Sequence, residues 1–282
     1  MNILVFGKTG QVARELQAQA RVTALERDDA DLSDPATCAA IIAANAPDAV
    51  INAAAYTGVD KAETDYDEAQ RVNAEAPGAM ARACAHLCIP LIHISTDYVF
   101  PGDGEAPWHP EDGTKPLGVY GATKLAGEEA VREAGGVHVI LRTSWVFSAH
   151  GNNFVKTMLR LSETRDALNV VADQIGGPSP ADAIAAACLE IAAQLRTNPQ
   201  KSGTYHFAGT PDASWCNFAQ AIFASAKRNV AVTGISTSDY PTPAARPLNS
   251  RLDCSTTTAQ FGIARPDWRA GLNRVLRDLR VV

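Results

Sequence analysis

Apolar and polar positions follow two different periods along the first half of the chain. Short apolar runs that are typical of buried strands lie at 2–6, 22–25, 49–52, 91–94 and 137–141. The stretches between them have a helical period, and they predict helices at 10–20, 34–44, 65–88 and 117–134. Because strands and helices follow one another in turn, we expect a doubly wound parallel sheet of the Rossmann-like α/β class.

The pattern changes after about residue 145, where glycine, proline and asparagine become denser. Helices are still predicted near 153–163, 180–195, 214–227 and 269–280. We interpret residues 1–150 as the sheet domain and residues 151–282 mainly as a smaller C-terminal lobe that binds a substrate. Part of about 165–212 is expected to return to the sheet, so the boundary is soft.

Composition excludes several classes of partner. The 282 residues are 46% hydrophobic, which is enough for a sizeable core, and the formal net charge of −6 argues against a nucleic-acid partner. No apolar stretch reaches the roughly 18 residues of a membrane span, and no signal peptide precedes the first strand, so we expect a cytoplasmic protein with no membrane partner. The six cysteines form no Cys-x-x-Cys pair and no zinc spacing, which predicts buried, reduced thiols and no metal ligands.

The first predicted strand ends in Gly7-Lys8-Thr9-Gly10-Gln11-Val12-Ala13, where a helix begins. Gly7 permits a sharp turn, and Gly10 lets the backbone approach a pyrophosphate at the positive end of the helix. Ala13 stands where a third small residue lets helix and strand pack closely. Since the turn lies between a strand and a helix at the start of the sheet, it predicts that residues 1–150 bind NAD(P).

The pair Glu26 and Arg27 ends the second predicted strand. A carboxylate at this place can bind the ribose hydroxyls of NADH, whereas an arginine can accommodate the 2′-phosphate of NADPH. The two residues therefore leave the choice of cofactor open, and ordinary surface charge is the alternative for both.

The segment from Tyr120 to Lys124 opens a predicted helix and places these two side chains on one helical face. An ammonium beside a phenol lowers the pKa of the phenol, which makes it a proton donor and acceptor for carbonyl and alcohol interconversion. Upstream, the strand at 91–94 runs into Ser95 and Thr96, and a hydroxyl at that strand end can hydrogen-bond a substrate carbonyl. Glycine turn, Thr96 and Tyr-x-x-x-Lys, in this order, indicate a dehydrogenase or reductase.

In this combination the sequence resembles the extended group of short-chain dehydrogenases/reductases, and more narrowly the dTDP-4-dehydrorhamnose reductase family. The matching segments keep the family's order over nearly the whole chain: Met1–Val12, Val50–Thr57, Ser95–Gly102, Val119–Gly127, Arg142–Val146, Gly151–Leu161, Asp173-Gln174 with Gly176, and Pro241–Leu252. Two positions depart from the family's usual choice, since Ala13 replaces a common glycine and Glu26 stands where Asp is also seen.

The resemblance implies a role for each matching position. Tyr120 is the proton donor, Lys124 holds the nicotinamide ribose, and Thr96 binds the sugar carbonyl with Asp97 beside it. Trp145 lines the substrate site, although a plain core role is the alternative for a tryptophan. The positions implied for the cofactor are Gly7, Gly10, Gln11, Val12, Glu26, Arg27, Asp31, Leu32, Ala55, Tyr56, Thr57, Ile94, Tyr120 and Lys124.

A proline-rich loop near the C-terminus contains Arg246, Asn249 and Arg251. Arginine forks match the geometry of a diphosphate, so we expect this loop to bind the nucleotide part of the substrate, with surface charge as the alternative. Some relatives bind a divalent cation at a subunit contact, and Asp182 is the candidate position for Mg²⁺ here. Homodimers are common among relatives, which makes a homodimer an expectation for this chain.

The function implied by the resemblance is reduction of dTDP-4-dehydro-β-L-rhamnose to dTDP-β-L-rhamnose by NADPH or NADH, a step in the supply of cell-surface polysaccharide. One alternative is another nucleotide-sugar ketoreductase or an epimerase on the same scaffold. The other is a non-catalytic, NADP-binding regulatory subunit, because the methionine adenosyltransferase β-subunit also resembles this family. The presence of Thr96, Tyr120 and Lys124 argues against lost catalysis.

Overall fold

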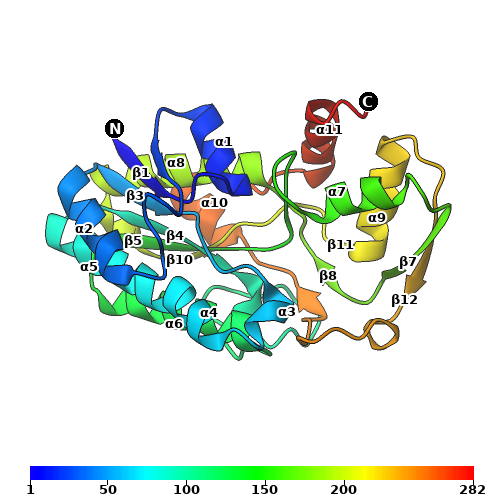
Figure 1. Cartoon of the computed structure of the whole chain (residues 1–282), viewed down its shortest axis with the longest axis horizontal. Coiled ribbons are helices and arrows are strands. Elements are labelled where there is room, and N and C mark those ends of the chain that lie inside the picture. Colours follow the sequence, from blue (N-terminus) through cyan, green and yellow to red (C-terminus); the bar gives the residue numbers. More distant parts are fainter.

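The computed structural model describes residues 1–282 and places a six-stranded sheet at the centre of the larger half of the molecule (Figure 1). All neighbouring strands in it are parallel, in the order β10-β5-β4-β3-β1-β2. The strands are β1 (Ile3–Phe6), β2 (Thr23–Leu25), β3 (Ala49–Asn52), β4 (Leu91–Thr96), β5 (His138–Thr143) and β10 (Gly203–His206). The Rossmann-like α/β class expected from the sequence is therefore confirmed.

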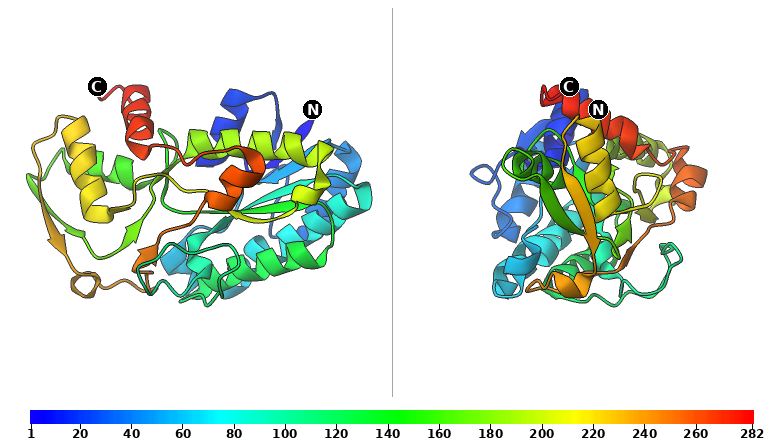
Figure 2. Two further views of the ribbon diagram at one scale, coloured as in Figure 1. Left: turned by 180° about the vertical axis from the view of Figure 1, so that it is seen from behind. Right: turned by 90° about the vertical axis from the view of Figure 1, so that its right-hand side faces the viewer.

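Alternate residues of the central strands supply two separate cores, because successive side chains of a strand point to opposite faces. Ile3 and Val5 pack with α1 (Gln11–Gln19) and α8 (Ala181–Thr197) on one face of the sheet. Leu4 and Phe6 pack on the other face with α2 (Pro35–Asn45), α5 (Ala76–Leu87) and α6 (Val119–Glu133). Figure 2 shows these two helical layers from behind and from the side.

The first five strands and the helices between them lie within two residues of the predicted ranges, with one exception. The helix predicted at 65–88 is three segments: α4 (Tyr66–Gln70), a π-helical turn (Arg71–Glu75) and α5. A short helix, α3 (Val59–Ala62), precedes them. The π-helical turn inserts an extra residue into the helix and changes which side chains face the sheet, an arrangement that recurs at functional sites.

The smaller part of the molecule is a lobe at one end of the sheet, at the right of Figure 1. Its core joins α7 (Phe154–Leu161), α9 (Trp215–Ser225) and α11 (Trp268–Asp278) to the parallel pair β7 (Ala167–Val171) and β12 (Ala231–Ile235). The sequence did not predict α10 (Ser255–Phe261) or five two-residue strands: β6 (Val146–Phe147), β8 (Ile175–Gly176), β9 (Ser179–Pro180), β11 (Ala213–Ser214) and β13 (Asn249–Ser250).

The order of the sheet reverses at β1, which lies between β2 and β3. Ligands of open parallel sheets bind at the carboxyl ends of the strands beside such a reversal. No helix in the structure has the length and apolar character that crossing a membrane requires. Five of the six cysteines are buried as expected, but the expectation is wrong for Cys88, which is exposed at the C-terminal end of α5, where the chain turns away with φ +56°.

Candidate active site

The turn between β1 and α1 is shaped to receive a pyrophosphate. Gly7 has φ +97°, and a Cβ there would lie 3.3 Å from the backbone carbonyl of Ala53 after β3. Gly10 caps α1 without a side-chain hydrogen bond, so the first N–H groups of the helix have no partner within it. A close backbone approach beside free N–H groups at a helix N-terminus fits the diphosphate of a dinucleotide.

Gln11 and Val12 follow the turn, but their side chains are engaged elsewhere. The Oε1 atom of Gln11 accepts from Ser148 Oγ at 3.0 Å and from Asn153 Nδ2 at 2.9 Å, which ties the turn to the start of the small lobe. Val12 is buried in the core beneath α1. Val12 can therefore meet a pyrophosphate only through its backbone N–H group, whereas Gln11 keeps an Nε2 group whose one hydrogen bond, to the Val146 carbonyl, is 3.4 Å long.

The end of β2 holds the charges that bear on cofactor choice. Lys8 Nζ donates to Glu26 Oε1 at 2.7 Å, and this bond raises the pKa of Lys8. Arg27 is largely exposed and 4.0 Å from Asp31, whose carboxylate accepts from the N–H of Ser33. Leu32 is buried. Lys8 of the glycine turn thus neutralises the charge of Glu26, a contact that was not predicted from the sequence.

Asn73 holds the segment that follows β3. Its Oδ1 accepts from the Tyr56 N–H at 2.8 Å, and its Nδ2 donates to the Tyr56 carbonyl at 3.1 Å and to Thr123 Oγ1 at 3.2 Å. The π-helical turn directs this side chain inward from Arg71–Glu75. Asn73 therefore joins α6 to Ala55, Tyr56 and Thr57, the stretch implied for the cofactor.

Thr96, Tyr120 and Lys124 meet at the carboxyl end of β4. Lys124 is 2% exposed, and its Nζ donates to the Ile94 carbonyl at 2.8 Å. Thr96 accepts from the Tyr98 N–H at 3.2 Å, and the Tyr98 ring lies edge-on to the Tyr120 ring with 5.5 Å between centroids. This approach requires Gly121, since a Cβ there would collide with the Tyr98 carbonyl.

The pKa values at this site differ from the sequence expectation in one respect. Burial raises the pKa of Tyr120, and a hydrogen bond with Thr96 opposes the rise only in part. The expected lowering by Lys124 is absent, because its ammonium lies against Ile94 and His93. Burial also lowers the pKa of Lys124 to about 8, against the opposing effect of Glu128. The lysine is thus protonated at neutral pH but close to its titration range.

Asp97 is 3% exposed and follows Thr96 directly. Its Oδ1 accepts from Thr96 Oγ1 at 3.1 Å, whereas its Oδ2 is buried without a hydrogen bond of good geometry, although the Ser250 hydroxyl is close enough to oppose the effect of burial on the pKa. Burial raises the pKa of this carboxyl to about 6. A buried oxygen without a partner is costly unless a ligand hydroxyl supplies one, which agrees with the substrate role implied for Asp97.

Trp145 projects from the end of β5 toward the small lobe. Its φ of +50° is a left-handed conformation that bulky side chains rarely adopt, and such strain is common at functional sites. The indole stacks on Trp215 of α9 with centroids 3.6 Å apart and 11° between planes. Trp215, which the sequence reading missed, therefore holds Trp145 in place.

The three residues of the proline-rich loop lie in different surroundings. Arg246 Nη2 donates to Asp60 Oδ2 at 2.7 Å, while its Nη1 is buried without a hydrogen-bond partner. Asn249 is 2% exposed, and its amide hydrogen-bonds the carbonyls of Asp103 and Ala106 and the guanidinium of Arg251. The structure places Asn249 as support for the loop, and its contact with substrate stays a prediction.

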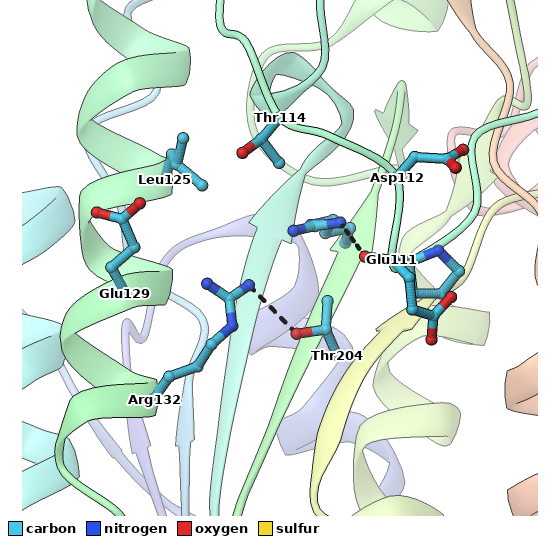
Figure 3. Close-up of a pocket in the computed structure, with 9 residues that line it drawn as sticks. Glu111, Asp112, Thr114, Leu125, Glu129, Arg132 and Thr204 are labelled. Carbon is cyan, nitrogen blue, oxygen red and sulfur yellow. Dashed lines mark hydrogen bonds between the residues drawn. The ribbon is translucent and has the colours of Figure 1, made fainter.

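Glu128 continues the face of α6 that bears Tyr120 and Lys124. Its carboxylate is fully buried and accepts from Arg142 Nε at 2.9 Å, Arg142 Nη2 at 2.7 Å and Ser95 Oγ at 2.6 Å. Figure 3 shows the neighbouring cavity of about 370 Å³, where Arg132 and Thr204 are hydrogen-bonded. None of the site residues expected from the sequence lines this cavity. The hydrogen bonds of Glu128 to Ser95 of β4 and Arg142 of β5 anchor α6 to these two strands.

The magnesium expectation at Asp182 gains no support. Arg274 Nε donates to Asp182 Oδ2 at 2.8 Å, so the carboxylate already has a cation beside it. No group of three or more His, Cys, Asp or Glu side chains in the structure is arranged to hold a metal ion.

Comparison with known proteins identifies the family of the chain. Residues 1–281 match the family model described as the RmlD substrate binding domain. A dTDP-4-dehydrorhamnose reductase of Sinorhizobium fredii is 46% identical, over 98% of this chain and 97% of the relative. A crystal structure of a dTDP-4-dehydrorhamnose reductase from Clostridium acetobutylicum has a TM-score of 0.92 at 35% identity, over 99% of this chain and 100% of that one.

A second solved structure is relevant to the cofactor. The dTDP-4-dehydrorhamnose reductase of Bacillus anthracis, in complex with NADP, has a TM-score of 0.91 at 33% identity and covers 98% of this chain and 99% of that one. Family model, relatives and structures agree over the whole length of the chain. The chain belongs to the RmlD family of dTDP-4-dehydrorhamnose reductases.

Proposed function

We propose that this chain reduces the C4 ketone of dTDP-4-dehydro-β-L-rhamnose to the alcohol of dTDP-β-L-rhamnose, with NADPH or NADH as reductant. The observation that carries the proposal is the meeting of Thr96, Tyr120 and Lys124 at the end of β4, on the edge of the sheet that also bears the glycine turn. The names of relatives at 41–46% identity support the same substrate.

The reduced nicotinamide supplies the hydride when it is bound, and the protein supplies the rest. Tyr120 holds its proton at Oη because burial keeps the phenol pKa high, which suits a group that must donate to the carbonyl oxygen. Thr96 hydrogen-bonds the same oxygen and orients it. Lys124, charged at neutral pH, would bind hydroxyls of the nicotinamide ribose.

The direct test supplies dTDP-4-dehydrorhamnose, made by the preceding enzymes, together with NADPH or NADH. We expect oxidation of the nicotinamide and the appearance of dTDP-rhamnose in equal amounts. Binding of NAD(P)H without turnover would overturn the proposal and favour a regulatory subunit. Interconversion of sugars without net oxidation of the cofactor would favour an epimerase.

The rate should depend on pH through Lys124. The pKa of this lysine is lowered to about 8 by burial, so the side chain is charged below that pH and neutral above it. We expect kcat/KM to be level below about pH 8 and to fall as the pH rises through it. Lys124→Arg, which stays charged throughout, should shift the fall to higher pH. Lys115→Gln on the exposed loop is the control and should leave it in place.

We infer that the Lys8–Glu26 pair lets the site accept both cofactors, because Lys8 offsets the repulsion between Glu26 and a 2′-phosphate. Glu26→Gln should therefore raise the ratio of kcat/KM for NADPH over NADH several-fold, since the lysine is then free to attract the phosphate. Asp28→Asn, a nearby exposed carboxylate, is the matched control. Equal ratios in wild type and Glu26→Gln would contradict this role of Glu26.

Three further expectations stay predictions. They are the binding of the nucleotide diphosphate by Arg246 and Arg251, the formation of a homodimer, and the cytoplasmic location.

A further inference from the structure

We infer that His93 is a positioning residue for catalysis, whose imidazole, held by Asn52, sets the hydrogen bonding of the Lys124 amino group. None of the steps proposed for the reaction uses this histidine. The inference rests on the proposed function, because Lys124 matters only if Tyr120 and its neighbours act on a carbonyl.

The three side chains form a buried row across two strands and a helix. Asn52 of β3 and His93 of β4 are register partners in the sheet, so their side chains point to the same face. Both are fully buried, and Lys124 of α6 is 2% exposed. Asn52 Nδ2 lies 3.1 Å from His93 Nδ1, and His93 Nε2 lies 3.4 Å from Lys124 Nζ.

The backbone after β3 determines which ring nitrogen of His93 bears the hydrogen. The Ala54 N–H donates to Asn52 Oδ1 at 3.2 Å, which orients the amide so that its Nδ2 group faces the imidazole. His93 Nδ1 must then accept, since Nδ2 has only hydrogens to offer. Burial, together with the charge of Lys124, holds the pKa of His93 well below its usual value, so the ring is neutral. A neutral ring that accepts at Nδ1 carries its hydrogen on Nε2.

That hydrogen points at the lysine. The Nε2–H group cannot be accepted by an ammonium, but it can be accepted by the lone pair of a neutral amine. The contact therefore disfavours the charged lysine, in the same direction as burial. It also keeps the N–H groups of Lys124 directed to the Ile94 carbonyl and away from the ring.

Charged and titratable groups on each neighbouring helix and strand also influence the pKa values of His93 and Lys124. Glu128, one turn along α6, favours the charged lysine. His138 at the start of β5 acts on His93 in the same direction as burial. Tyr120 lies one turn before Lys124, and Asp97 follows β4. Burial is the largest influence on the lysine and lowers its pKa, Glu128 opposes it, and we infer that His93 adds to the effect of burial.

An apolar residue at position 93 would fill a sheet interior at lower cost, since the flanking Ile92 is fully buried and apolar. A buried imidazole needs a polar partner at both nitrogens. In His93 these partners are the side chains of Asn52 and Lys124. One belongs to the strand that leads into the cofactor segment, and the other is the catalytic lysine.

The test measures the titration of Lys124 directly, in the cofactor-free protein, by NMR of isotope-labelled lysine with the resonance assigned by its loss in Lys124→Met. His93→Asn keeps a polar atom near Asn52 and removes the group that faces Lys124. His93→Gln places an amide oxygen where Nε2 stood and lets it accept from the ammonium. We expect both to raise the titration midpoint of Lys124 by about 0.5–1 pH unit, the latter more, and to move the alkaline fall of kcat/KM equally.

Two further variants separate the effect of the imidazole on Lys124 from a general effect of substitution in the sheet. Asn52→Ala releases the constraint on the ring without touching Lys124, and it should raise the same midpoint. His138→Asn changes a half-buried histidine on the next strand and should leave the midpoint unchanged. An unmoved midpoint in folded His93 and Asn52 variants overturns the inference, even if their activity is lost. A midpoint that moves in a protein without reductase activity supports the chain of contacts and counts against the proposed function alone.

Discussion

Tyr120→Phe is expected to lower kcat by about 10²–10⁴-fold, or roughly 3–5 kcal/mol of transition-state stabilisation, with the dissociation constant for NADPH nearly unchanged. The substitution removes only the hydroxyl that donates the proton, and the ring keeps its edge-on packing against Tyr98. Steady-state turnover with dTDP-4-dehydrorhamnose measures the first quantity, and cofactor titration by fluorescence measures the second.

Tyr98→Phe is the matched control for this experiment. It removes a phenol of the same site, whose pKa burial raises to about 12, but one that we do not place on the reacting carbonyl. We expect a much smaller loss of kcat than for Tyr120→Phe. Turnover at the wild-type rate in Tyr120→Phe, or equal losses in the two variants, would contradict the assignment of Tyr120 as proton donor.

Glu128→Gln is expected to reduce the free energy of unfolding by about 3–5 kcal/mol, because it leaves the guanidinium of Arg142 buried without an anion. Arg142 is 2% exposed and makes two hydrogen bonds to this carboxylate, and Arg132 adds a third at 2.7 Å. Burial alone would raise the pKa of Glu128, but Arg142, Ser95 and Arg132 outweigh it and hold the pKa below its usual value. Urea unfolding at neutral pH measures the difference.

Glu129→Gln provides the control one residue further along α6. Glu129 is exposed, so loss of its charge should change the free energy of unfolding by no more than about 0.5 kcal/mol. The contribution of Glu128 should also decline as the pH falls through the lowered pKa of its carboxyl, since the ion pair needs the charged form. If the two variants unfold at the same urea concentration, the buried cluster does not stabilise the fold as we describe.

The arrangement of the first 145 residues could be predicted because its signals are local. Strands such as β1 and β3 are continuous apolar runs, since both of their faces are covered by helices. In the intervening helices, apolar residues recur about once every turn. The small lobe offered weaker signals. Strands of two residues, such as β6 and β9, are too short to show a period, and they exist only because their partners lie alongside.

The candidate site likewise contains residues that the sequence predicts and others that only the structure shows. Sequence by itself determined the positions of Gly7, Thr96, Tyr120 and Lys124, because each lies at a strand end or helix start whose order dictates that they meet at one edge of the sheet. The π-helical turn that directs Asn73 inward has no local signal in the sequence, and in the structure it packs against α6.

Only the tertiary structure decided what surrounds these residues. Glu128 with Arg142, Trp145 with Trp215, and His93 with Asn52 are pairs whose members are far apart in the chain or on different strands. The sequence therefore determined that a phenol and an ammonium share one helical face. Burial and the partners supplied by neighbouring strands decided their charge, because the pKa of a group depends on the solvent and dipoles around it in three dimensions.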